Sequence, residues 1–321
     1  MVFEALLTPL VFNAAVFAIS LFILFYSADL LIDGISSYAK KLGLSDEIIG
    51  LVVIALAASM PEIVAALGGL AANETGLLFG TIIGANMVHM GFLVGGLALL
   101  GRKLTLECRL IQKSKFLIWA LLLLPFVLAS DGLLSRSDGI VLVAVFGIYL
   151  VRLWKLEEKR TRLKKHIHLK NVWRDVAIFL GALIALILSG RYLVFSAIIL
   201  SREFGIPSYF IAITVIAICS AIPDFAVGIR SIFKGKQDIG IGDIIGSTVI
   251  ELLLFLGIVA IFEPLTIIVP TIATASIFLI ICITLLLFFL RNRAITWKHG
   301  LALMGVYLAF IITEIWKLVS M

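Results

Sequence analysis

The sequence predicts an all-α polytopic membrane protein built from two similar halves, and three observations lead to this fold class. Of the 321 residues, 62% are hydrophobic and 14% are charged, whereas a soluble domain has roughly 45–50% apolar and about 25% charged residues. The apolar residues form runs of the length that a membrane-spanning helix needs, which is about 20 residues. A proline followed by an acid interrupts two of these runs, at Pro61-Glu62 and at Pro223-Asp224.

Ten apolar runs are predicted to be transmembrane helices. The proline-acid pairs fall in the second and seventh runs, and the third contains His89. One long polar stretch, 155–171, divides the chain into a five-helix half at 1–154 and a second at 172–321. The ten runs cover approximately 9–41, 46–71, 75–101, 109–130, 138–154, 172–204, 207–233, 238–262, 265–290 and 296–317.

The basic residues predict the orientation. Lys and Arg are concentrated in the 155–171 linker and in the loops on its side of the membrane, while the opposite loops are poor in them. The positive-inside rule therefore predicts a cytoplasmic linker and both termini outside. The N-terminus has no basic segment and carries Glu4, so the first run is expected to remain as a helix rather than to be removed as a signal peptide.

Composition also limits the partners. The basic residues lie in short loops between apolar runs, which does not suggest nucleic-acid binding. The three cysteines have no Cys-x-x-Cys spacing, so neither a disulfide framework nor a zinc site is indicated. We expect a monomer surrounded by membrane lipids. The absence of a large regulatory loop between the halves favours a prokaryotic plasma membrane.

The two halves align without a gap at an offset of 162 residues. This offset places Pro61-Glu62 on Pro223-Asp224, and His89 on Glu251. It also places Gly80-Thr81-Ile82-Ile83-Gly84 on Gly242-Asp243-Ile244-Ile245-Gly246, which we call the glycine boxes. Because each half has an odd number of predicted spans, the halves would lie in opposite orientations across the membrane. Such inverted-topology repeats are typical of secondary transporters, whose broken helices meet near the midplane.

Acids inside membrane helices indicate a functional site, since one at bilayer depth costs roughly 2.5–3.5 kcal/mol on insertion scales. Four helices meeting near the midplane would form an oxygen-rich cage, and hard cations such as Ca²⁺ bind about 6–8 oxygens. With no cation bound the acids would repel each other, so the carrier would change sides only when cations or protons occupy the site. The predicted cation ligands are Glu62, Asp224, Glu251, His89, Ser59, Ser220, Ser247 and Asp243.

Two of these residues have alternative interpretations. Asp243 shares a helical face with Ser247 and Glu251, but it would also be able to brace its glycine box through backbone donors. His89 would serve as a softer ligand for Zn²⁺ or Mn²⁺, or it would pair with Glu62 or Glu251 and carry a coupling proton.

The proline-acid pairs and glycine boxes resemble the cation/calcium exchanger superfamily over nearly the whole chain. In that family a Gly-Thr-Ser-x-Pro-Glu box precedes a Gly-Asn-x-x-Gly-Ser-x-x-x-Asn or Asp box in each half. The resemblance implies a sodium/calcium exchanger-like fold of ten helices, with cations bound between the second, third, seventh and eighth. It also implies that the first and sixth helices slide across the other eight.

The chain departs from the family boxes in the residues beside the acids. Ala58, Ala85 and Ala221 replace hydroxyl residues that in the family largely serve sodium sites, and His89 replaces Asn. Asp224 is one methylene shorter than the usual Glu, and Glu251 is one longer than the usual Asp. The coupling ion is therefore open between Na⁺ and H⁺.

We predict a secondary active antiporter that exchanges Ca²⁺, or a related divalent cation, for Na⁺ or H⁺ by alternating access, with no cofactor. One alternative is a proton-coupled exchanger of transition metals or Mg²⁺ on the same fold. A second is an intramembrane enzyme using the Glu/Asp/His cluster, against which the sequence lacks His-Glu-x-x-His and Gly-x-Ser-x-Gly motifs. A third is a non-transporting sensor. The prediction is that the chain is not an enzyme.

Overall fold

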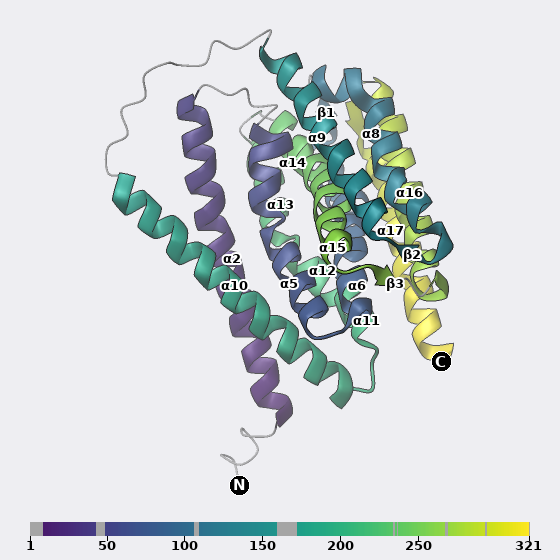
Figure 1. Cartoon of the computed structure of the whole chain (residues 1–321). Coiled ribbons are helices and arrows are strands. Elements are labelled where there is room, and N and C mark those ends of the chain that lie inside the picture. The colour runs from purple at the N-terminus through teal and green to yellow at the C-terminus, as the bar shows by residue number, and fades with distance from the viewer. Residues whose placement is uncertain are drawn as a thin grey trace.

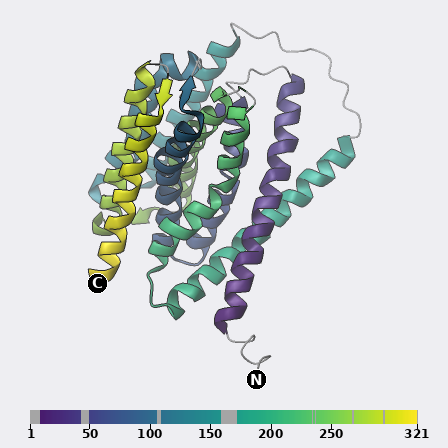
Figure 2. The same ribbon diagram turned by 180° about the vertical axis from the view of Figure 1, so that it is seen from behind.

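The protein is a bundle of apolar helices, seen from two sides in Figures 1 and 2. The computed structural model describes residues 9–42, 49–105, 109–158, 172–233, 235, 237–266, 269–292 and 294–320. Within these residues, seven helices are long and apolar enough to cross a membrane. Three shorter apolar helical segments, Leu10–Leu24, Ala55–Ala71 and Ser208–Ser220, accompany them. Most of the predicted linker, 159–171, lies outside the described residues, and helix α9 continues to Glu158.

The elements of the first part of the chain are α2 (Pro9–Leu42), the π-helix η1 (Ile49–Ile54), α4 (Ala55–Ala58), α5 (Met60–Ala71), α6 (Thr75–Met87), the π-helix η2 (Val88–Leu93), α7 (Val94–Gly101), β1 (Lys103–Thr105), α8 (Arg109–Leu128), the 3₁₀-helix η3 (Ala129–Asp131), β2 (Leu133–Leu134) and α9 (Arg136–Glu158).

The second part forms α10 (Val172–Glu203), α11 (Ser208–Ile211), the π-helix η4 (Ala212–Ile216), α12 (Ala217–Ser220), α13 (Ile222–Phe233), α14 (Gln237–Val249), the π-helix η5 (Ile250–Phe255), α15 (Leu256–Phe262), β3 (Leu265–Thr266), α16 (Val269–Phe289), the 3₁₀-helix η6 (Leu290–Asn292), β4 (Ala294–Thr296) and α17 (Trp297–Ser320).

The bounds of the elements recur at the sequence offset of 162 residues. Adding 162 to the bounds of α5, α6 and η2 gives the bounds of α13, α14 and η5, with no shift at either end. Proline explains one shared boundary. Pro61 has no N–H to donate to the carbonyl of Ala57, so α4 ends at a turn and α5 starts anew. Proline is well tolerated in a first helical turn, where its N–H would have no intrahelical acceptor.

Four short strands, which the all-helical prediction did not include, join the two parts of the chain. β1 pairs antiparallel with β4 and β2 pairs antiparallel with β3, so each small sheet takes one strand from each part. The pair Leu104–Ile295 in one sheet corresponds, at the same offset, to the pair Leu133–Thr266 in the other. Helix α8 separates β1 from β2, so the two sheets lie toward opposite ends of the bundle (Figure 1).

Two long segments form the centre of the bundle. The span Thr75–Gly101 has 94% of its most apolar window buried and Gln237–Phe262 has 83%, whereas the other five candidate spans have 22–41% buried. The more exposed spans carry apolar side chains on their outer faces, including Phe116, Ile148 and Ile312. An apolar outer surface around a buried centre suits a lipid environment.

Helices α2 and α10 pack against each other and stand to one side of the remaining bundle, crossing at an angle (Figures 1 and 2). Helix α10 also lies against α5. The start of α2 and the end of α17 lie at the same end of the bundle (Figures 1 and 2).

Candidate cation site

The two glycine boxes bring segments from opposite parts of the chain together. A Cβ on Gly84 would lie 2.7 Å from the Cα of Ile213 in η4, and a Cβ on Gly246 would lie 2.2 Å from the carbonyl oxygen of Leu51 in η1. Only glycine allows approaches this close. Ile213 and Leu51 are themselves related by the offset of 162. Helix α6 thus packs against the second part of the chain and α14 packs against the first, an arrangement that we call crossed packing.

This crossed packing gathers four acids and one histidine inside the bundle. Glu62 lies in the first turn of α5 and Asp224 in the first turn of α13. Asp243 is on α14, while His89 and Glu251 lie on the π-helices η2 and η5. All five side chains are fully buried. Single π-helical turns are frequent at functional sites.

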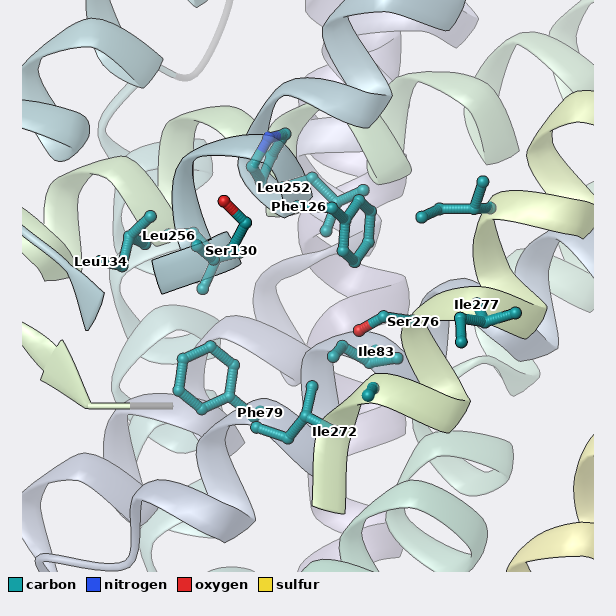
Figure 3. A pocket seen from close by; sticks show the side chains of 14 residues that line it. Phe79, Ile83, Phe126, Ser130, Leu134, Leu252, Leu256, Ile272, Ser276 and Ile277 are labelled. Atoms are coloured by element: carbon teal, nitrogen blue, oxygen red, sulfur yellow. The ribbon is translucent and has the colours of Figure 1, made fainter. Parts of the chain in front are cut away.

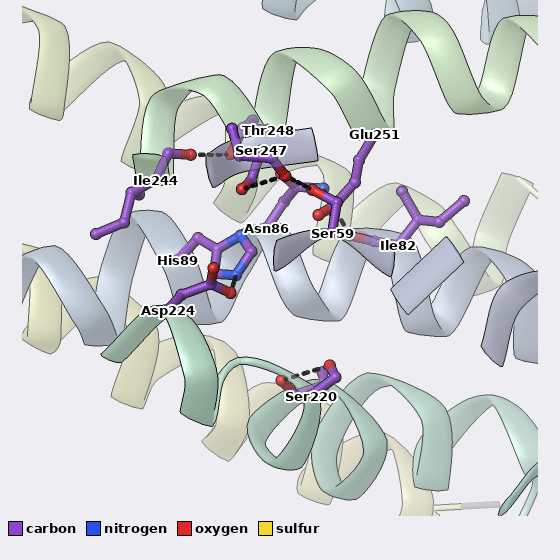
Figure 4. A network of polar contacts seen from close by, with 12 residues as sticks. Ser59, Ile82, Asn86, His89, Ser220, Asp224, Ile244, Ser247, Thr248 and Glu251 are labelled. Carbon is purple, nitrogen blue, oxygen red and sulfur yellow. Dashed lines mark hydrogen bonds and ion pairs between the residues drawn. The ribbon is translucent and has the colours of Figure 1, made fainter. Parts of the chain in front are cut away.

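Three of these side chains form a compact group. One ligand atom from each of Glu62, His89 and Asp224 can be chosen so that all lie within 4.8 Å of one another. His89 Nε2 is 2.9 Å from Asp224 Oδ2 (Figure 4). The expected pairing of His89 with Glu62 or Glu251 is therefore wrong, because crossed packing of the two parts turns the imidazole toward Asp224.

Glu251 lies beside this group and not in it. Its Oε2 accepts a hydrogen bond of 2.9 Å from Asn86 Nδ2, and the same amide nitrogen donates to the carbonyl of Ile82 at 2.7 Å (Figure 4). The charges of Asp224 and Glu251 both act on Glu62 and on Asp243. The acids predicted from the sequence are thus neighbours, but only two of them belong to the compact group.

The three predicted serine ligands are buried among these acids. Ser59 Oγ donates to the carbonyl of Ala55 at 2.9 Å, and Ser247 Oγ donates to the same carbonyl at 3.4 Å. Ser220 Oγ donates to the carbonyl of Ala217 at 3.3 Å. Ser220 lies beside Glu62 and Ser59 beside Glu251. Because the hydroxyl protons point to backbone carbonyls, the oxygen lone pairs stay free to contact a cation.

Asn86 is a functional candidate that the sequence interpretation missed. It occupies an unspecified position of the family box, although the repeat offset pairs it with another polar residue, Thr248. Both are fully buried, and Thr248 Oγ1 donates to the carbonyl of Ile244 at 3.1 Å. Of these two residues, only Asn86 has a described contact with an acid of the other part of the chain, Glu251. The sequence signal that could have identified Asn86 is that the repeat offset places one polar residue on another at this position.

The acids carry oxygens without hydrogen-bond donors within the described part of the chain. These atoms are both carboxylate oxygens of Glu62 and of Asp243, Oδ1 of Asp224 and Oε1 of Glu251. Buried polar atoms in proteins nearly always have a partner, and an isolated buried charge is very unfavourable. A bound cation would supply the missing partner to several of these oxygens at once.

An apolar cavity of about 220 Å³ lies elsewhere in the bundle, between α6, α8, η5 and α16. Phe79, Ile83 and Phe126 point into it, and Ser130 and Ser276 contribute hydroxyls (Figure 3). None of its described lining residues is acidic, so it does not suit a cation.

A buried, carboxylate-rich centre between apolar helices defines a membrane carrier for cations. The chain belongs to the sodium/calcium exchanger protein family, whose sequence profile matches residues 12–155 and 175–316. It is therefore an integral membrane protein of an exchanger family and not an enzyme, which removes the intramembrane-enzyme alternative.

Several named relatives agree with this assignment. The chain is 30% identical over 260 residues to the inner membrane protein YrbG of Escherichia coli, covering 78% of this chain and 80% of YrbG. It is 23% identical over 342 residues to the sodium/calcium exchanger MaX1 of Methanosarcina acetivorans, covering 94% and 97%.

Two kinds of solved structure share the fold. The sodium-calcium exchanger NCX_Mj superposes with a TM-score of 0.72 at 21% identity, covering 94% of this chain and 99% of that one. The H⁺/Ca²⁺ exchanger CAX superposes with a TM-score of 0.77 at 17% identity, covering 94% and 86%.

Proposed function

We propose that this protein is a secondary active antiporter that exchanges Ca²⁺, or a related divalent cation, for Na⁺ or H⁺. The observation that carries the proposal is the fully buried group of Glu62, His89 and Asp224, whose ligand atoms lie within 4.8 Å of one another. Relatives named as exchangers of Ca²⁺ with Na⁺ or with H⁺ support the choice of ion class.

The ligands are assigned by their chemistry. Glu62 and Asp224 are the central ligands, because they come from opposite parts of the chain and keep three unpartnered oxygens between them. Glu251 and the hydroxyls of Ser59, Ser220 and Ser247 complete an oxygen-rich shell of the kind that Ca²⁺ binds. The cations are transported substrates, and no further cofactor is needed.

The proposed topology is ten transmembrane helices in two inverted five-helix halves, 1–154 and 172–321. The recurrence of element bounds at one offset supports this topology. The same offset relates the β1–β4 sheet to the β2–β3 sheet, which supports it too. In this topology the basic linker 155–171 is cytoplasmic and both termini are outside. Helix α2 starts and α17 ends at the same end of the bundle (Figure 1). This placement is consistent with an even number of transmembrane helices.

Alternating access would arise from movement of α2 and α10 across the rest of the bundle. These helices pack against each other as a pair, and α10 touches α5, which carries Glu62. A pair that moves as one body would open the acids to one side of the membrane and then to the other, as inverted-repeat carriers do.

Proteoliposome uptake tests the proposal. We expect Ca²⁺ uptake to be driven by an outward Na⁺ gradient or by a proton gradient, and to be lost in Glu62→Gln. Glu314→Gln is the matched control, because Glu314 is also a buried glutamate in a long apolar helix but pairs with Lys317 at 2.9 Å. Absence of uptake under both gradients, or equal uptake by Glu62→Gln and wild type, would contradict the proposal.

A second candidate is a transition-metal exchanger, which the contact of His89 with Asp224 favours. An imidazole nitrogen suits Zn²⁺ and Mn²⁺ better than Ca²⁺. The same vesicles should then take up Mn²⁺ in preference to Ca²⁺, and His89→Asn should reverse the preference. Unchanged selectivity in His89→Asn would exclude this candidate.

A further inference from the structure

An open groove of about 280 Å³ lies on the outer surface of the bundle, between α8 and α16. These residues lie near the start of α8 and the end of α16, which places the groove at the end of the bundle that carries the β1–β4 sheet. The groove is separate from the candidate cation site, because it shares no lining residue with it. Its described lining residues are Lys115, Phe116, Trp119, Thr284, Leu287 and Phe288.

The walls of the groove are mainly apolar and aromatic. Phe116 and Phe288 are 77% and 63% exposed, and Phe116 stacks on Trp119 with 6.0 Å between the ring centroids. The indole Nε1 of Trp119 donates to Thr284 Oγ1 at 3.2 Å, so this contact joins α8 to α16. Tryptophan is enriched where the apolar core of a membrane meets the lipid headgroups. The groove therefore suits an acyl chain that begins at headgroup level.

Lys115 supplies a positive charge to this apolar groove. It is half-buried and has no hydrogen-bond or ion-pair partner within the described part of the chain. None of the described lining residues is acidic. Further exposed cations, Arg102, Lys103 and Arg291, lie at the same end of the bundle. An unpaired ammonium in an apolar groove fits a ligand with an anionic head and an apolar remainder.

The repeat provides an internal comparison for this groove. The offset of 162 relates each of the three polar lining residues to an aliphatic one: Lys115 to Ile277, Trp119 to Ile281 and Thr284 to Leu122. Phe288 keeps an aromatic counterpart, Phe126. Phe126 and Ile277 both line the apolar cavity between α8 and α16 (Figure 3). The packing of these two helices therefore does not itself require a lysine or a hydrogen-bonding pair, which indicates that the polar residues serve a ligand.

We propose that this groove binds an anionic phospholipid, with Lys115 contacting the headgroup phosphate and the aromatic and aliphatic side chains contacting an acyl chain. Basic pockets between transmembrane helices bind anionic headgroups in this way. A headgroup with a net negative charge is favoured over a zwitterionic one, whose own cation competes with the lysine. The proposed topology would place the groove in the cytoplasmic leaflet, where the surface potential is negative. The inference does not depend on cation exchange.

Equilibrium binding of radiolabelled lipid to the purified full chain in detergent tests the inference. The probes are phosphatidylglycerol and phosphatidylcholine with identical acyl chains. We expect wild type to bind phosphatidylglycerol about fivefold more tightly, which is the difference that one lysine near a membrane surface provides. Lys115→Gln should make the two affinities equal. Lys298→Gln is the matched control and should keep the preference, because Lys298 is an exposed lysine at the same end that lies over the Trp297 ring and does not line the groove.

A further variant tests the acyl-chain wall. Trp119→Leu should weaken the binding of both lipids by a similar factor, because it alters the apolar wall and leaves the charge in place. Inorganic phosphate at matched ionic strength should not displace phosphatidylglycerol, since the acyl chain contributes to binding.

Several outcomes would overturn the inference. Equal affinities of the wild type for the two lipids would do so without any variant having to fold. An equal loss of preference in Lys115→Gln and Lys298→Gln would show attraction to the basic surface as a whole. Unchanged lipid binding by Trp119→Leu would place the lipid outside the groove, and displacement by inorganic phosphate would assign Lys115 to a free anion.

Discussion

Asn86 and Glu251 form a buried polar contact that joins the two parts of the chain. The amide nitrogen of Asn86 has two acceptors, the Ile82 carbonyl and Glu251 Oε2, and so fixes the direction in which the glutamate points. Glu251 is one methylene longer than the family's usual Asp, and a longer side chain has more rotamers to restrict. Asn86 is therefore a positioning residue for a proposed cation ligand.

Replacing Asn86 tests this role. A hydrogen bond to a charged group contributes about 1.5–3 kcal/mol, so Asn86→Ala should weaken the apparent affinity for Ca²⁺ by roughly tenfold or more. The measurement is the Ca²⁺ dependence of uptake into proteoliposomes. Thr248→Val is the control, since the Thr248 hydroxyl serves only the Ile244 carbonyl among the contacts described. Equal affinities in Asn86→Ala and Thr248→Val would show that Asn86 does not position Glu251.

The break before α5 is the element that places Glu62 in the first turn of a helix. Pro61 leaves the Ala57 carbonyl without its helical donor and starts a new helix whose first turn holds the acid. A helix N-terminus carries partial positive charge, which stabilises a carboxylate there. The same arrangement holds Asp224 at the start of α13.

Pro61→Ala should restore the missing donor and make α4 and α5 continuous. We expect the uptake rate to fall by about tenfold or more, equivalent to a barrier raised by about 1.4 kcal/mol, while the thermal unfolding temperature does not fall. Pro125→Ala is a suitable control, because Pro125 lies inside the long helix α8, where it lines the apolar cavity. Transport by Pro61→Ala at the wild-type rate would show that the helix break is not needed for transport.

The contact of α10 with α5 depends on Gly190. A Cβ at this position would lie 2.1 Å from Val64 Cγ1, so a larger residue requires the Val64 side chain or one of the helices to shift. Gly190→Ala should therefore destabilise the protein by about 1–3 kcal/mol, as overpacking does, and slow exchange. Thermal unfolding and uptake rates are the measurements.

Two further variants make this test specific. Gly181→Ala lies on the same helix, where a Cβ would meet nothing within 4 Å, and it should behave like wild type. The double variant Gly190→Ala with Val64→Ala should recover much of the lost rate, because it removes the colliding methyl groups. Equal stability and equal uptake rates of the two glycine variants would mean that the α10–α5 contact does not limit the rate of exchange.

At the scale of the whole molecule, two small sheets, one toward each end of the bundle, join the two parts of the chain. Each sheet pairs a strand of the first part with a strand of the second. The offset of 162 relates β1 to β3 and β2 to β4, so it relates one sheet to the other. A two-fold axis relating the parts would have this effect. If the axis lies in the membrane plane, the two parts face opposite sides of the membrane.

Single-cysteine labelling tests the orientation of the whole molecule. After Cys108, Cys219 and Cys282 are replaced by serine, a cysteine at Ser320 should react with a membrane-impermeant maleimide added to intact cells. A cysteine at Lys165 should react only after permeabilisation, because the positive-inside rule keeps the basic linker in the cytoplasm. Labelling of both from the same side would contradict an odd number of spans between the linker and the C-terminus.

Local pattern in the sequence was enough for much of the protein. The lengths of the apolar runs indicated the membrane helices, because spanning requires a fixed number of apolar residues in succession. Pro61-Glu62 and Pro223-Asp224 indicated the helix breaks, because loss of one backbone donor acts within a single turn. The glycine boxes at the same offset pointed to close helix contacts and to most of the acids.

The partners of those acids were decided by tertiary structure. Whether His89 meets Glu62, Glu251 or Asp224 depends on how α6 and α14 cross between the two parts, and no spacing within one helix contains that information. The π-helices η2 and η5, which carry His89 and Glu251, were also not predicted from the sequence. The sequence alone thus determined which polar residues lie within apolar helices, while the packing of one part against the other decided which of them touch.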